Sequence, residues 1–365
     1  MRPMGPLDRV AGAHDAAVLA VARHGEPVSR AGLADALQVT PQAISKILAR
    51  LIERGLMAEG GTISSGPGKP TTLYAIVPAS RRAVGLHLTR TRVHGVVTDL
   101  TGRVLERLVA PIPAGTAVPA LIALLAATAR DLAAHGDGEL LGVGVGMPGP
   151  VDSTTGVHLG FSPGTEAWHD AAIRDLLLAE LGLPVLVDHD SRSALVGESW
   201  SQPGLLDNAV LVLVEDGIGA ALCLDGTIVR GAHSRAGEAG HMVVRMGGEP
   251  CTCGRRGCAQ AELLAALRDG DEQRAADVLA TVVLDLVRLV DVDRVVLGGR
   301  TMHSHHGTIM TAIRTAIEEG LAGPDTGHVE VLLSTRGVDL IAAGAACEVL
   351  EVEYGLPTSL VGPEQ

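Results

Sequence analysis

Residues 240–258 read GHMVVRMGGEPCTCGRRGC and contain three of the five cysteines in this chain of 365 residues. One histidine and three cysteines form a complete tetrahedral donor set for a structural zinc ion. The predicted ligands are His241, Cys251, Cys253 and Cys258. A disulfide would leave an odd thiol, and Cys251 and Cys253 are too close in sequence for ordinary bridge geometry. Because four protein ligands leave no open position for a substrate, the pattern predicts a zinc ion that holds a loop in place.

Length and composition indicate two or three domains, with neither a signal peptide nor an apolar run of membrane length. Unpaired cysteines suit a reducing cytoplasm, where we expect the protein to work, and Cys223 and Cys347 lie among apolar residues typical of a core. The net charge is −13, yet residues 1–80 carry eight Lys and Arg against six Asp and Glu. A slightly basic module on an acidic body favours a protein that meets a polyanion through one small domain.

The segment 28–61, VSRAGLADALQVTPQAISKILARLIERGLMAEGG, predicts a helix-turn-helix. Ser29 would cap the first helix and Thr40 the second, with Pro41 at its first position. The second helix has apolar residues at spacings of 3, 4 and 7 on one face and polar or basic residues on the other, as a recognition helix requires. The stretch 55–77 then predicts a β-wing with a Gly/Ser tip. A plain amphipathic helix pair is the alternative, and it leaves the wing and the local basic charge unexplained.

We expect a winged helix-turn-helix DNA-binding domain in residues 1–78 and a ligand-binding and oligomerisation domain in residues 79–365. Basic residues of the second helix would contact phosphate, whereas Gln42 and Ser45 would lie nearer base edges. Lys69 in the wing tip would reach a minor groove. The predicted DNA-binding residues are Thr40, Gln42, Ser45, Lys46, Arg50 and Lys69.

Two similar β-meanders are predicted, in residues 82–109 and 208–231, each followed by helical segments. Their recurrence favours a duplicated α/β architecture with a cleft between two lobes. The stretch GVGVGMPG at 142–149 contains a literal G-x-G-x-x-G. Pro148 cannot donate an N–H to a pyrophosphate and the strand-to-helix context is missing, so we predict a buried strand that ends in a Pro-Gly turn.

The cysteine loop and the helix-turn-helix, taken with four further stretches, resemble the ROK family of repressors, open reading frames and sugar kinases. These stretches are MPGPVDSTTGV (147–157), VLVDHDSRSALVGE (185–198), GEAGH (237–241) and VVLGG (295–299). The resemblance covers essentially the whole chain, and the helix-turn-helix places it with the regulators of the family. It implies an α/β, actin-like (ribonuclease-H-like) two-lobed domain behind a winged helix-turn-helix, in a cytoplasmic oligomer that binds a sugar in its cleft.

The resemblance also implies a sugar site. The Asn-Asp pair of the family's kinases matches His189-Asp190, so Asp190 is kept as an acceptor for sugar hydroxyls while His189 changes the donor set. Glu238 and His241 match the sugar-contacting E-x-x-H, and Gln260 stands where the family has a carboxylate. Trp168 matches an aromatic near the sugar, although a single Trp is more often a core residue than a stacking platform. The predicted ligand-binding residues are His189, Asp190, Glu238, His241, Gln260, Trp168 and Arg90.

Catalysis is not expected. The family's kinases carry D-x-G-G-T in the first hairpin turn, where this chain has HLTRT at 87–91, so a carboxylate has become an imidazole and both glycines have side chains. In the second phosphate turn Glu215 and Asp216 would repel a triphosphate. We therefore expect a relative without kinase activity, in which Asp190 is the remnant of a catalytic base. An ATP-dependent sugar kinase with an accessory DNA-binding domain is the alternative.

The first turn instead brings cations to this end of the cleft, with His87, Arg90 and Arg92 near it and Arg192 following Asp190. These cations could recognise a sugar phosphate, or they could be solvated charges at strand ends. The sequence thus predicts a sugar-responsive repressor of carbohydrate uptake and metabolism genes, bound as a homodimer or homotetramer to an inverted-repeat operator. Ligand closure of the cleft would reorient the helix-turn-helix units. Control by a protein partner is a third possibility.

Overall fold

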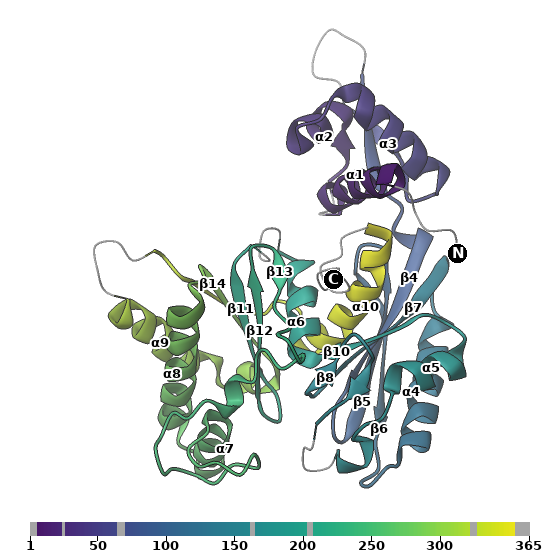
Figure 1. The fold of residues 1–365 in the computed structure, drawn as a ribbon. Helices are drawn as coiled ribbons and strands as arrows, with labels where there is room; N and C mark the ends of the chain where they lie inside the picture. The colour runs from purple at the N-terminus through teal and green to yellow at the C-terminus, as the bar shows by residue number, and fades with distance from the viewer. Residues whose placement is uncertain are drawn as a thin grey trace.

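The computed structural model describes residues 6–23, 26–63, 70–160, 165–202, 207–321 and 327–354. A small N-terminal module sits on a body of two lobes, and the last helix, α10 (Leu340–Tyr354), rises between the lobes towards the module (Figure 1). None of the described helices is both long and apolar enough to cross a membrane.

The N-terminal module combines three helices with a three-stranded antiparallel sheet of order β1-β3-β2. Its elements are α1 (Pro6–Ala22), β1 (Val28–Ser29), α2 (Arg30–Leu37), α3 (Pro41–Glu53), β2 (Met57–Ile63) and β3 (Thr71–Ile76). Both predicted caps form, because Ser29 Oγ accepts the Gly32 N–H at 3.0 Å and Thr40 Oγ1 accepts the Ala43 N–H at 3.3 Å. The winged helix-turn-helix is confirmed, with α3 as its recognition helix. Helix α1, which supplies core residues such as Leu19, was missed in the sequence.

Lobe I contains a five-stranded sheet of order β10-β7-β4-β5-β6, in which the first meander is antiparallel and β7 and β10 are parallel to β4. Its elements are β4 (Arg81–Leu88), β5 (Arg92–Asp99), β6 (Val104–Pro111), α4 (Val118–Ala133), β7 (Glu139–Met147), the hairpin β8 (Val151–Asp152) and β9 (Val157–His158), α5 (Ile173–Leu181) and β10 (Val185–His189). Helices α4 and α5 share one hydrophobic core with this sheet, and α10 packs on its other face.

The glycines of GVGVGMPG allow α10 to lie directly on the sheet. A Cβ at Gly144 would lie 1.9 Å from the Ala345 carbonyl oxygen, and one at Gly85 on the neighbouring strand would lie 1.8 Å from the Ala342 oxygen. Strand β7 is buried from Gly142 towards Met147, as expected. These glycines therefore serve helix–sheet packing and not phosphate binding.

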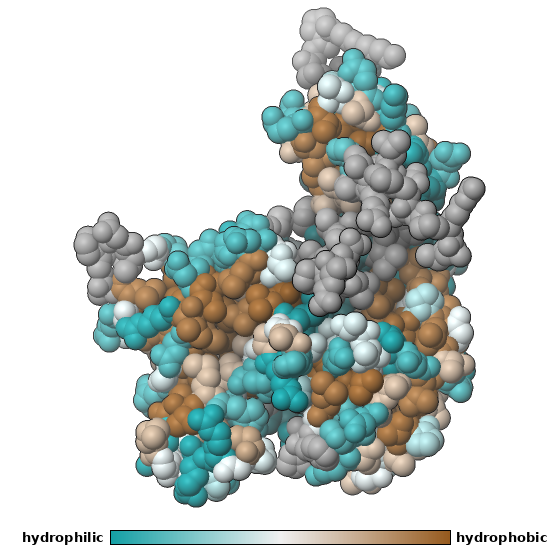
Figure 2. Space-filling model, viewed as in Figure 1, coloured by the Kyte–Doolittle hydropathy of each residue, from teal (hydrophilic) through white to brown (hydrophobic). Residues whose placement is uncertain are grey.

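Lobe II repeats the plan with a sheet of order β13-β12-β11-β14-β15, covered by three helices on one face. Its elements are β11 (Ala209–Val214), β12 (Ile218–Leu224), β13 (Thr227–Ile228), α7 (Ala259–Asp269), α8 (Glu272–Val290), β14 (Arg294–Gly298), α9 (Arg300–Gly320) and β15 (Glu330–Leu333). On the visible face, hydrophobic residues gather over the β11 and β14 region and hydrophilic ones over α7 (Figure 2). The duplicated α/β architecture with two lobes is confirmed.

Helix α6 (Asp190–Ser199) lies between the lobes beside α10 (Figure 1). The side chains of strand β11 show that helices cover both faces of the lobe II sheet. Leu211 and Leu213 belong to the core that contains α6 and α10, whereas Val210 and Val212 belong to the core of α8 and α9. Alternate residues of a strand point to opposite faces, so this sheet is covered on both sides.

Candidate functional site

A cavity of about 170 Å³ lies where β4 and β10 of lobe I meet the β11–β12 turn of lobe II. The ligand-binding residues predicted from the sequence that line it are Arg90, His189, Asp190, Glu238, His241 and Gln260. Its other walls include the 148–150 turn and two residues of the cysteine loop, Thr252 and Cys253. Its lining includes charged and polar side chains such as Arg90, Asp190 and Glu238, so the cavity suits a small polar ligand.

The side chains of His189 and Asp190 are in contact in the wall of the cavity, and they form an ion pair when the imidazole is protonated. His189 Nδ1 lies 2.9 Å from Asp190 Oδ1, and the same carboxylate oxygen accepts the Ser191 N–H at 2.6 Å. Burial would lower the pKa of His189, but the charge of Asp190 and its hydrogen bond outweigh burial and raise it. Burial would raise the pKa of Asp190, but His189 outweighs burial and lowers it. Asp190 is therefore a charged acceptor and a weak base.

His87 is a neutral imidazole in the cavity wall. Burial lowers its pKa to about 4, although the nearby Asp190 carboxylate acts in the opposite direction. It pairs across strands β4 and β5 with His94, and the two rings stack with their centroids 5.9 Å apart. An uncharged ring at this position adds no positive charge for a phosphate. Of the cations predicted at this end, Arg90 lines the cavity, whereas Arg92 lies exposed at the start of β5.

In the second phosphate turn, the carboxylates of Glu215 and Asp216 are paired with an arginine, which the sequence did not reveal. Arg300, at the start of α9, donates from its backbone N–H to Glu215 at 2.9 Å and from Nε to the same carboxylate at 2.5 Å. Its Nη2 donates to Asp216 at 2.5 Å. Gln260 packs against the same turn, since a Cβ at Gly217 would lie 2.4 Å from Gln260 Oε1. The carboxylates expected to repel a triphosphate thus have a partner within the chain.

Two sequence expectations for this site are wrong. Trp168 does not line the cavity: it is 2% exposed in the core of lobe I, and its Nε1 donates to the Thr116 carbonyl at 3.0 Å. Arg192 is also fully buried and donates from Nε to Asp188 at 2.5 Å, so it is not available to a ligand phosphate. In each case the side chain satisfies a buried partner, which spacing along the chain does not show.

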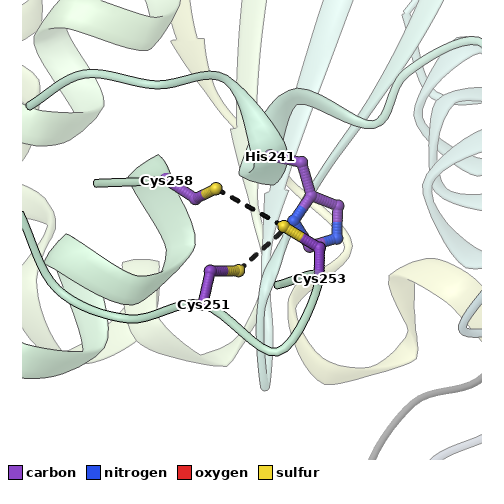
Figure 3. Close-up of side chains that lie close together, drawn as sticks. All are labelled: His241, Cys251, Cys253 and Cys258. Atoms are coloured by element: carbon purple, nitrogen blue, oxygen red, sulfur yellow. Dashed lines mark hydrogen bonds between the residues drawn. The ribbon is translucent and has the colours of Figure 1, made fainter. Parts of the chain in front are cut away.

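The four predicted zinc ligands converge in the cysteine loop (Figure 3). Their donor atoms all lie within 4.8 Å of one another, with Cys251 Sγ 3.5 Å from His241 Nδ1 and Cys253 Sγ 3.6 Å from Cys258 Sγ. A tetrahedral zinc ion would place two thiolates about 3.8 Å apart and a thiolate about 3.5 Å from an imidazole nitrogen. The donor set therefore fits zinc in number, type and spacing.

His241 links this cluster to the cavity. Its Nδ1 faces the sulfurs, and its Nε2 lies 4.0 Å from Glu238 Oε2. A carboxylate beyond the second ring nitrogen commonly fixes the orientation of a metal-binding histidine. The other side of the loop is anchored by the buried Glu262, which accepts the Glu249 N–H at 2.6 Å and pairs with Arg274 at 2.6 Å. Glu262 itself does not line the cavity.

The recognition helix presents Gln42 and Lys46 to solvent. Ser45 donates its hydroxyl to the Pro41 carbonyl at 2.9 Å, and Thr40 caps the helix. Arg50 binds the buried Asp15 of α1 through two N–H groups, so its guanidinium ties two helices together, which argues against a role in phosphate contact. Lys69 lies outside the described residues.

The fold and the cavity define the class of protein: a winged helix joined to a two-lobed, actin-like domain of the sugar-kinase type. The ROK family model matches residues 83–268, and a MarR family model matches residues 15–58. The chain belongs to the ROK family. A solved ROK family transcriptional regulator, a homologue of the Escherichia coli MLC protein, superposes with a TM-score of 0.76 at 20% identity over 95% of this chain and 97% of the other.

Relatives of known name include both regulators and kinases. The DNA-binding transcriptional dual regulator NagC of Escherichia coli (strain K12) is 30% identical over 282 residues, 76% of this chain and 68% of NagC. The xylose repressor of Caldicellulosiruptor bescii is 25% identical over 237 residues, and the match spans 64% of this chain and 59% of that repressor. A glucokinase from Halalkalibacterium halodurans is 36% identical over 129 residues, 33% of this chain and 37% of the enzyme.

Proposed function

We propose that this protein is a sugar-responsive repressor of carbohydrate uptake and metabolism genes, with residues 1–78 binding operator DNA and residues 79–365 binding the sugar. One observation carries the proposal. The cavity keeps the carboxylates of Asp190 and Glu238 for sugar hydroxyls, while its phosphate turn is closed by Arg300 on Glu215 and Asp216. The same chain carries a winged helix, and NagC and the xylose repressor are regulators by name.

Kinase activity is the competing function, because Asp190 is present and kinases are related. Phosphoryl transfer needs a base for the attacked hydroxyl and cations or N–H groups around the transferred phosphate. Here the pKa of the base is lowered by the neighbouring His189, and His87 is neutral. ATP would also have to break the ion pairs of Arg300. Neither deprotonation of the sugar hydroxyl nor binding of the transferred phosphate is therefore favoured, and we propose that the protein is not an enzyme.

The size and lining of the cavity favour a monosaccharide or an amino sugar. Charged acceptors stand at Asp190 and Glu238, and Gln260 can both donate and accept a hydrogen bond. Arg90 adds one cation at the HLTRT turn, which would pair with a 6-phosphate if the ligand carries one. Xylose, glucose and N-acetylglucosamine, with their phosphate esters where these exist, are the first compounds to test.

We further propose one structural zinc ion per chain, held by His241, Cys251, Cys253 and Cys258. When bound, it would neutralise the thiolates and fix the loop that supplies Thr252 and Cys253 to the cavity wall. The protein would act in the cytoplasm as a homodimer or homotetramer on an inverted repeat, each winged helix reading one half-site with Gln42, Ser45 and Lys46.

The test combines three measurements on the full chain. A sugar that binds the folded state raises the melting temperature, so one member of the sugar panel should do so at millimolar concentration. A duplex selected from a random pool should bind and then be released or retained on addition of that sugar. ATP with Mg²⁺ should give no sugar phosphate above background. Steady ATP-dependent phosphorylation would make the protein a kinase, and failure to select any duplex would remove the DNA-binding function.

A further inference from the structure

Helix α6 runs from the ligand cavity to the DNA-binding module. Its first residue is Asp190, and all ten residues from Asp190 to Ser199 are buried. Ten residues span about 15 Å of helix. Its C-cap is Trp200, which is 4% exposed. One end of a single rigid element therefore carries a cavity carboxylate, and the other end is an aromatic ring beneath the module.

Trp200 is held on several sides. A Cβ at Gly102, in the β5–β6 turn, would lie 2.8 Å from the indole, and Cys347 of α10 belongs to the same hydrophobic core. The guanidinium of Arg23, the residue after α1, stacks over the ring at 4.2 Å from its centroid. Leu19 and Ala22 of α1 share this core with Trp200. The module thus rests on the C-terminal end of α6.

Contacts along α6 connect it to the rest of the body. Ser191 donates its hydroxyl to the Ala220 carbonyl of β12 at 2.9 Å, and the buried Glu198 accepts from the Thr335 hydroxyl at 2.8 Å. Against α10 the backbones touch, since a Cβ at Gly344 would lie 1.7 Å from the Ser193 carbonyl oxygen. Packed backbones do not deform gradually, so a change at Asp190 shifts α6 as a unit.

We propose that α6 transmits the state of the cavity to the DNA-binding module, and that the Arg23–Trp200 contact is its output end. This inference rests on the proposed function, because the transmitted change would regulate DNA binding. Its first test needs neither ligand nor DNA. A ligand that hydrogen-bonds to Asp190 would weaken the contact between His189 and Asp190 and displace α6. The packing of α1 against Trp200 would then change. The winged helix would then change its orientation relative to the body.

The first test uses tryptophan fluorescence without ligand or DNA. The chain has two tryptophans, so Trp168→Phe leaves Trp200 as the sole reporter. In that background Arg23→Ala should raise the acrylamide quenching constant of Trp200 about twofold, because it removes the cover of the ring. Asp190→Asn, at the far end of α6, should also change the quenching or the emission maximum. Thr252→Ala is the matched control, a change at an exposed cavity residue outside α6 that should leave Trp200 unchanged.

The second test is a double-mutant cycle on the affinity for a duplex that the wild type selects from a random pool. Asp190→Asn should change that affinity about fivefold or more, the lower range of allosteric coupling. In the Arg23→Ala background the same change should have less than a twofold effect, and Arg23→Lys should restore part of it. Arg30→Ala is the control, since Arg30 stacks on Tyr74 within the module at 5.5 Å and should leave the coupling intact.

The outcomes separate the two proposals. If Asp190→Asn leaves Trp200 fluorescence unchanged while far-UV circular dichroism shows a folded chain, α6 does not transmit and the inference is wrong. Additive effects of Asp190→Asn and Arg23→Ala, within twofold, would overturn it equally. If the wild type selects no duplex, the proposed function fails, and the fluorescence of Trp200 still decides whether α6 responds to its cavity end.

Discussion

Replacing Cys253 by alanine is the sharpest test of the cysteine cluster. Cys253 is exposed, and its sulfur lies 3.6 Å from Cys258 Sγ, so the change removes one donor without opening a hole in a core. Cys258, by contrast, is fully buried, and its replacement would mix loss of a ligand with loss of packing. Cys253 also lines the cavity, so its loss reports on the ligand site as well.

The expected magnitude follows from the number of donors. Structural zinc sites with four ligands bind with an apparent free energy of about 10–16 kcal/mol near neutral pH. An equal share among four donors gives about 2.5–4 kcal/mol for one thiolate, or roughly a 10²- to 10³-fold weaker affinity. The backbone amides of the loop between Met242 and Cys258 should then lose protection against hydrogen exchange, because Glu262 anchors the loop only at Glu249 and Arg245.

The assay has two parts. Elemental analysis should find one zinc per wild-type chain, and competition with a chromogenic chelator should give the ratio of affinities. Hydrogen exchange should then show faster exchange in residues 240–258 of the variant, with the β-sheets unchanged. Cys223→Ala is the matched control, since Cys223 is a buried thiol on β12 outside the cluster and its removal should leave the zinc content at one per chain.

Two results would refute this reasoning. Wild-type protein purified without chelators should keep its metal, so an absence of stoichiometric zinc would refute the site. A variant at Cys253 that still holds one zinc with unchanged affinity would show that this thiol is not a ligand, whatever its position in the cluster.

Further predictions concern DNA, pH and ligand charge. Lys46→Ala should weaken binding to all duplexes and reduce the slope of log K against log salt by about 0.9, the value for one lost phosphate contact. Arg50→Ala should instead lower the stability of the module by about 1–2 kcal/mol, measured by thermal unfolding, because the buried Asp15 carboxylate loses this partner. The effect is modest because solvent partly screens the charge of Arg50. His87 has a folded-state pKa of about 4 against an ordinary 6.5, so the unfolded chain binds more protons between these values and stability falls as the pH drops through that window. The loss should reach about 2 kcal/mol at pH 5 and be absent in His87→Gln; an unchanged pH profile in that variant would contradict the buried neutral ring. Arg90→Ala should weaken binding of a 6-phosphosugar about tenfold or more and leave the parent sugar unaffected, as calorimetry can show; equal losses for both would argue against a phosphate contact.

Local patterns predicted much of this protein correctly. Ser29 and Thr40 cap the helices of the helix-turn-helix, because a cap needs only a hydroxyl three residues before a free backbone N–H. The spacing of His241 and the three cysteines predicted a cluster that the fold brings together, since a short glycine-containing loop has few ways to place four donors. The fold class followed from the meanders and from family motifs carried within short stretches of sequence.

The partners of charged and aromatic side chains depended on contacts across the chain. Arg300 reaches Glu215 over 85 residues, Arg50 reaches Asp15 over 35, and Trp168 donates to Thr116 over 52. No periodicity encodes such pairs, because they form only when separate elements pack and a buried donor or acceptor must be satisfied.

The sequence by itself therefore determined the winged helix-turn-helix, the two-lobed α/β class and the donor set for zinc, which depend on residue type at short spacing. The tertiary structure decided which predicted residues share a cavity, that Asp190 is held by His189, and that the phosphate turn is closed from within. It also decided that α6 links Asp190 to Arg23 through Trp200. These features arise from packing: elements that are far apart in the chain come together, and their charged and aromatic side chains then contact partners that the order of the sequence does not show.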